Sequence, residues 1–89
     1  MVLQLNDNIS IPIASMDRNL FETGINVIIQ SNQSIPIDEL LQMKIANNNK
    51  FCFIVGEQEF EDYELNHVSE HYDSSTKEIM STINFSKQL

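Results

Sequence analysis

The second half of the chain, residues 51–86, reads FCFIVGEQEFEDYELNHVSEHYDSSTKEIMSTINFS. It opens with Phe51–Val55, an apolar run of strand length, and Ile79–Phe85 places apolar residues on one face at a period of two. Gly56–Glu57 suits a two-residue type II′ turn, because glycine supplies the positive φ of the first central position. The turn-forming residues Tyr72–Lys77 mark the next reversal. The stretch therefore predicts a three-stranded antiparallel meander over about residues 51–86.

The middle strand of this meander, from residue 58 to about 72, does not alternate cleanly. Its apolar residues fall into two parity groups, Phe60 with Val68 and Tyr63 with Leu65. One extra residue in a strand switches the face on which the following side chains lie. We therefore predict a β-bulge near Asp62.

The start of the chain predicts a β-hairpin. Val2–Leu5 is one strand, Asn6–Asn8 is the turn, and Ile9–Ile13 alternates apolar with polar residues. Pro12 has no backbone N–H, so the second strand is expected at a sheet edge.

The next segment predicts a short helical turn and then a strand. Ser15 can cap a turn that runs through Leu20 and Phe21, and Gly24 can end it with a positive φ. Ile25–Ile29 then alternates with one isoleucine on the opposite face, which predicts a strand with both faces partly covered.

One α-helix is predicted over about residues 37–46. It follows Pro36, its first turn is acidic, and apolar residues recur three, four and eight places after Ile37. Asn47–Lys50 is expected to end it.

Together these elements predict one domain, residues 1–89, of the α+β class with a predominantly antiparallel sheet. The 89 residues are 42% hydrophobic, which is enough for a folded core of modest size. No apolar run approaches the roughly 20 residues that span a bilayer. The first eight residues lack the basic start and long apolar stretch of a signal peptide, so we expect a cytoplasmic protein without a membrane partner.

The charge argues against nucleic acid as a partner. Thirteen acidic and five basic residues give a net charge of −8, and such a field repels phosphates. No Lys or Arg occurs between Phe51 and Thr76.

This acidic segment is the candidate partner-binding surface. Carboxylates that alternate along a strand form a solvated face, and the same face can attract a basic protein. Aromatic side chains often anchor such interfaces, although core packing is their more frequent role. The candidate partner-binding residues are Glu57, Glu59, Glu61, Asp62, Tyr63, Glu64 and Tyr72.

Metal and catalytic patterns are weak. His67 and His71 match the H-x-x-E-H spacing of inverted zinc proteases, but shared zinc ligation at that spacing needs a helix, and the flanking residues favour a strand. Cys52 is the only cysteine, and its apolar surroundings predict a buried, inert thiol. Two glycines cannot build a phosphate-binding loop, and no nucleophile motif occurs. We expect no enzymatic activity, no cofactor and no bound metal.

The meander carries a family resemblance. Phe51, Gly56, Phe60, Tyr63 and Leu65, followed by the 72–77 turn and then Ile83 and Phe85, resemble the small β-rich accessory proteins encoded in bacteriophage tail modules. The Asn, Ile and Lys content is similar to that of low-GC phage or bacterial genomes. The resemblance implies a component that assembles into a ring or baseplate, and it carries over no functional residue.

Two functions follow as expectations. The first is a non-enzymatic protein-binding or assembly module of phage origin that self-associates into a homo-oligomer or docks to larger virion parts. The alternative is a small acidic inhibitor in which residues 57–64 occupy a basic groove of a host protein.

Overall fold

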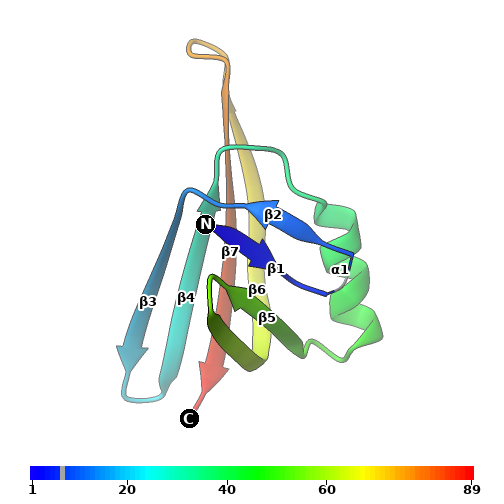
Figure 1. Cartoon of the computed structure of the whole chain (residues 1–89), viewed down its shortest axis with the longest axis vertical. Helices are drawn as coiled ribbons and strands as arrows, with labels where there is room; N and C mark the ends of the chain where they lie inside the picture. The colour runs from blue at the N-terminus through cyan, green and yellow to red at the C-terminus, as the bar shows by residue number, and fades with distance from the viewer. Residues whose placement is uncertain (7) are drawn as a thin grey trace.

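The computed structural model describes residues 1–6 and 8–89 of the chain (Figure 1). Within these residues it contains an antiparallel seven-stranded sheet and one helix, so the predicted β-rich α+β class is confirmed. The elements are β1 (Val2–Gln4), β2 (Ser10–Pro12), β3 (Ser15–Phe21), β4 (Gly24–Ser31), α1 (Ile37–Ala46), β5 (Phe51–Val55), β6 (Gln58–Asp73) and β7 (Glu78–Gln88).

The sheet curls into two packed layers because β6 belongs to both. The strand order is β2-β1-β5-β6-β7-β4-β3. The first part of β6 pairs with β5, and its longer second part pairs with β7. Figure 1 shows β1, β2 and β5 crossing over β6 and β7, with α1 at one side. The inner faces of the two layers enclose the core.

Aromatic rings join the two layers. Phe53 stacks on Phe60 with ring centroids 4.8 Å apart and on Phe85 of β7 at 4.3 Å. Phe51 lies 5.5 Å from Phe85, and Tyr63 packs edge-on against Phe53 at 5.5 Å. Burying one such side chain contributes about 1.5–3 kcal/mol, and favourable ring pairs add about 0.5–1.5 kcal/mol. The β5–β7 contact is therefore a major source of stability.

The predicted bulge in β6 is confirmed, and a second one follows it. Between the pairs Phe51↔Tyr63 and Phe53↔Phe60 the register shifts, and Asp62 has a φ of 59°. The register shifts again between Leu65 and His67 in the pairing with β7. The first bulge turns Tyr63 and Leu65 to the side of Phe60, and the second lets Val68 return to that side. The sequence predicted only the first.

The helix has the predicted bounds but a narrower buried face. Leu40 is fully buried, and Ile37 and Met43 pack partly against the core. Leu41 and Ile45, which share the predicted apolar face, are 42% and 83% exposed. Because α1 contacts the sheet mainly along β6, only one narrow stripe of the helix is covered.

The helical turn predicted for residues 15–24 is wrong, because this segment forms β3 and the start of β4. Ser15 to Phe21 pair in continuous register with Gln30 to Gly24. This ladder supplies backbone partners, whereas a single helical turn is costly to nucleate. Gly24 does not have a positive φ. A glycine is needed there because the backbones of β4 and β7 approach closely, and an added Cβ would overlap the carbonyl oxygen of Lys87.

The N-terminal hairpin and β4 match their predictions. β1 pairs with β2, and β2 lies at one edge of the sheet with Pro12 at its end. Asp7, in the predicted turn, lies outside the described residues, while the Oδ1 of Asn6 accepts hydrogen bonds from the backbone N–H groups of Asn8 and Ile9. β4 buries Val27 and Ile29 on one face and half-buries Ile28 on the other.

Candidate protein-binding surfaces

The predicted carboxylates lie together on the β5–β6 hairpin. Phe60 and Tyr63 point into the core, so the residues between and beside them point outward. The side chains of Glu57, Glu59, Glu61, Asp62 and Glu64 are all exposed. These five residues define the acidic surface, and mutual repulsion among them favours a cationic partner.

A shallow groove of about 260 Å³ borders the acidic surface. Its lining includes Gln4, Cys52, Ile54, Glu59 and Glu61. Cys52 is exposed, so the expectation of a buried thiol is wrong. The reason is strand alternation: Phe51, Phe53 and Val55 are buried, which turns Cys52 and Ile54 outward.

Lys87 is the cation next to the acidic surface. Its Nζ donates a hydrogen bond of 3.0 Å to the backbone carbonyl of Glu61 and lies 5.7 Å from the centroid of the Tyr63 ring. It therefore offsets part of the negative charge on one side.

The two tyrosines among the candidate partner-binding residues are not brought together. Tyr63 is 3% exposed and packs against Phe53 and Phe60, so it belongs to the core and cannot line an interface in this fold. Tyr72 is 57% exposed at the far end of β6. Nine residue-to-residue steps along β6 separate them, a span of about 30 Å.

The two histidines lie on β6, which is a strand as the flanking residues indicated. Both are exposed. Four residues of strand span about 13 Å, which is too far for His67 and His71 to coordinate the same zinc ion. Within the described part of the chain no three His, Cys, Asp or Glu side chains are close enough to hold a metal.

Glu70, between these histidines, fastens the loop that leads to α1. Its Oε1 accepts hydrogen bonds of 2.8 Å from the Ile35 backbone N–H and the Ser34 hydroxyl. The Ile35 bond, reinforced by the Ser34 bond, holds the pKa of Glu70 below its ordinary value. Glu70 is thus a structural link.

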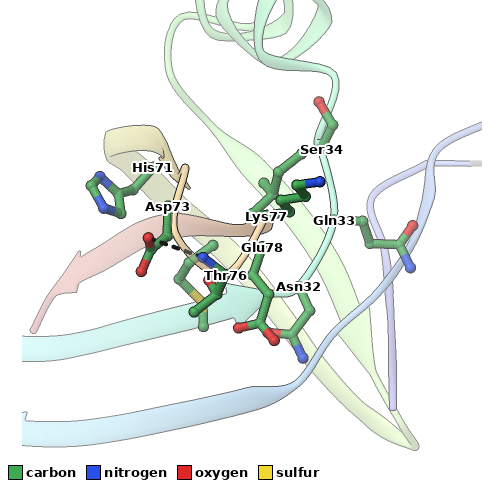
Figure 2. A pocket seen from close by; sticks show the side chains of 10 residues that line it. Asn32, Gln33, Ser34, His71, Asp73, Thr76, Lys77 and Glu78 are labelled. Carbon is green, nitrogen blue, oxygen red and sulfur yellow. Dashed lines mark hydrogen bonds between the residues drawn. The ribbon is translucent and has the colours of Figure 1, made fainter.

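Beyond β4, the ends of β6 and β7 form an arm, residues 70–80, that projects from the body (Figure 1). Its turn is fixed by Asp73, whose Oδ1 accepts bonds from the Ser75 hydroxyl at 2.6 Å, the Ser75 N–H at 2.9 Å and the Thr76 N–H at 3.4 Å. These bonds, with the Ser75 hydroxyl first, lower the pKa of Asp73. A groove of about 620 Å³ runs between the arm and residues 32–34 (Figure 2).

The exposed edge of strand β3 is a further candidate binding surface, and it was not predicted from the sequence. It lies at one end of the strand order, and Figure 1 shows no strand beyond it. Leu20 and Phe21 at its end are 71% and 59% exposed. The alternation of Met16, Arg18 and Leu20 was the available signal, but the charged and amide residues in this segment are typical of turns.

No helix in the described residues has the length and apolar content needed to cross a membrane. Comparison of the chain with protein-family models, with curated proteins and with solved structures returns no match.

Proposed function

We propose that this protein is a non-enzymatic assembly module that self-associates through the free edge of β3. The observation that supports the proposal is a seven-residue edge strand that ends in two exposed apolar side chains, Leu20 and Phe21. Unpaired strand edges present backbone donors and acceptors to another chain, and apolar side chains there add affinity. The proposal includes a role in a bacteriophage tail or baseplate, because the meander resembles the small β-rich accessory proteins of phage tail modules.

The two sheet edges differ in a way that favours β3. The other edge strand, β2, has three residues and includes Pro12, and both features discourage pairing. β3 contains no proline and pairs with β4 without a register shift. Of the two edge strands in the described part of the chain, β3 is therefore the one with a long, regular edge.

Self-association is tested by measuring the molar mass of the wild type and Leu20→Lys by light scattering after gel filtration. A lysine on an edge strand hinders strand addition, so the variant should be monomeric while the wild type is oligomeric. Ile45→Lys is the matched control, because it places the same charge at an exposed apolar position on α1 and should leave the oligomer intact. A wild type that is monomeric up to millimolar concentration would overturn the proposal.

A second candidate function is inhibition of a basic host protein. It is supported by the acidic surface, whose five carboxylates are exposed on one hairpin. Such a surface could occupy a groove that normally holds nucleic acid, with electrostatic attraction speeding the encounter.

The inhibitor function predicts a complex that dissociates as salt is raised. Glu59→Lys/Glu61→Lys should abolish capture of the host protein at 50 mM NaCl, whereas Asp38→Lys/Glu39→Lys, with the same change in net charge on α1, should retain it. Equal loss in both variants, or capture that is unchanged at 500 mM NaCl, would rule this function out.

A further inference from the structure

The arm carries a strand edge that the fold leaves unpaired. β4 ends at Ser31, which lies opposite Ser81, while β7 begins three residues earlier at Glu78. Residues 78–80 therefore have β6 on one side and no strand of the described chain on the other. The groove lies on that open side, because Glu78, Ile79 and Met80 all line it.

The chain after β4 is held so that the groove stays open. The Ser81 hydroxyl donates a 2.6 Å hydrogen bond to the Gln33 carbonyl, and the Gln33 N–H points to the Ser31 hydroxyl at 3.4 Å. Ser31 and Ser81 are both buried. These bonds fix the turn that directs residues 32–34 away from the line of β4. Figure 2 shows Gln33 and Ser34 on one side of the groove and His71 and Asp73 on the other.

The groove has a negative side next to apolar groups. Asp73 and Glu78 form a cross-strand pair, an arrangement that is destabilising for like charges. Lys77 also lines the groove, so the groove's two carboxylates outnumber its one ammonium group. Ile79 and the partly exposed Met80 supply apolar surface.

We propose that this groove binds an extended peptide segment of a partner protein that carries a basic side chain. The peptide backbone pairs with residues 78–80 as an added strand in line with β4. Its lysine or arginine contacts the carboxylates of Asp73 and Glu78, and an apolar side chain two residues along the peptide, on the same face, packs on Met80. This site is separate from the free edge of β3 and does not depend on self-association.

The test is an NMR titration of the ¹⁵N-labelled protein with a capped seven-residue peptide in which threonine and valine alternate outward from one central lysine. Amide signals of residues 78–80 and 32–34 should shift, and a peptide with glutamate in place of lysine should not shift them. Shifts centred on β3 or on the acidic surface, equal binding of the two peptides, or the same shifts on raising protein concentration alone would each overturn the proposal. The last outcome would assign the groove to a second copy of the chain.

A charge reversal at Glu78 separates binding from folding. Glu78→Lys replaces the repulsive pair with Asp73 by an attractive one, so the arm should remain folded while affinity for the lysine peptide falls roughly 5-fold or more. Glu22→Lys, which makes the same charge change in the turn between β3 and β4, should bind like the wild type. Equal weakening in both variants would show only general attraction to an acidic protein and would contradict the proposed site.

Discussion

Glu70 connects two parts of the chain that are far apart in sequence through a single carboxylate oxygen. The bonds from Ile35 and Ser34 hold the loop that leads to α1 against β6. Because they favour the ionised form, the pKa of Glu70 is lower in the folded protein than its ordinary value of 4.5. The stabilisation is therefore complete above the unfolded pKa and is lost as the pH falls through the folded pKa.

Glu70→Gln should lower the thermal midpoint at pH 7, and the difference from the wild type should shrink as the pH falls below 4.5. Thermal unfolding followed by circular dichroism across this range measures it. Glu64→Gln, at another exposed glutamate of β6, is the control and should change the midpoint little. A wild-type advantage over Glu70→Gln that grows towards acid would contradict the assigned role.

Asn49 lies just before β5, and its side chain makes hydrogen bonds to β6 in place of strand backbone. Its Oδ1 accepts a 2.8 Å bond from the Leu65 N–H, and its Nδ2 donates to the Leu65 carbonyl at 3.4 Å. Its φ is 54°, a left-handed conformation that asparagine tolerates. The amide therefore satisfies Leu65 next to the second bulge of β6.

Asn49→Ala should lower the unfolding free energy by about 1–3 kcal/mol, because it leaves the Leu65 backbone N–H and carbonyl without their Asn49 hydrogen-bond partners. Asn48→Ala is the matched control, since Asn48 has a φ of 53° and an exposed side chain. Urea unfolding of the two variants separates lost hydrogen bonds from backbone strain. If both variants lose the same stability, the Asn49 side-chain bonds contribute nothing measurable.

At the scale of elements, the turn between β3 and β4 is held against β7 by close backbone contact at Gly24. A Cβ there would lie 3.1 Å from the Lys87 carbonyl carbon and would overlap its oxygen. We expect Gly24→Ala to cost about 2 kcal/mol, because backbone on both strands must shift. Gly56→Ala meets no atom within 4 Å and changes only a residue with a φ of 62°, so about 1 kcal/mol is expected. Urea unfolding that reverses this order would contradict the tight β4–β7 contact.

The elements that local pattern predicted are those whose signal is contained within a few residues. The helix at Ile37–Ala46, the turn at Gly56 and the bulge at Asp62 all follow from nearby residues and are observed. β3 was missed because its strand conformation depends on pairing with β4, and its own residues favour a turn. Local propensity is overruled here because hydrogen bonding to the adjacent strand β4 supplies more free energy than a turn formed by these residues alone.

The candidate surfaces also divide into those that local sequence pattern predicts and those that it does not. The acidic surface follows from the sequence, because a charged run on an amphipathic strand must point outward. Tyr63 does not belong to that surface, because the bulge at Asp62 places its side chain on the same side as Phe60. The β3 edge and the arm groove depend on the strand order and on where β4 stops relative to β7, and no local pattern encodes either.

At the scale of the whole molecule, a net charge of −8 on 89 residues should make stability depend on salt. Like charges repel one another more strongly in the compact state, and the screening length falls from about 30 Å at 0.01 M salt to about 10 Å at 0.1 M. The thermal midpoint should therefore rise by about 4 °C between 10 and 300 mM NaCl, which corresponds to a gain of about 0.5–1 kcal/mol in unfolding free energy.

Variants that change the net charge show whether repulsion causes this rise. Glu59→Gln/Glu61→Gln removes two of the eight excess negative charges, leaving −6, and should reduce the salt dependence. Lys50→Gln removes one positive charge, giving −9, and should increase it. All three positions are exposed, so core packing is unchanged. Identical salt dependence in the three proteins would mean that ions act on folding by a route other than screening, and the repulsion argument would fail.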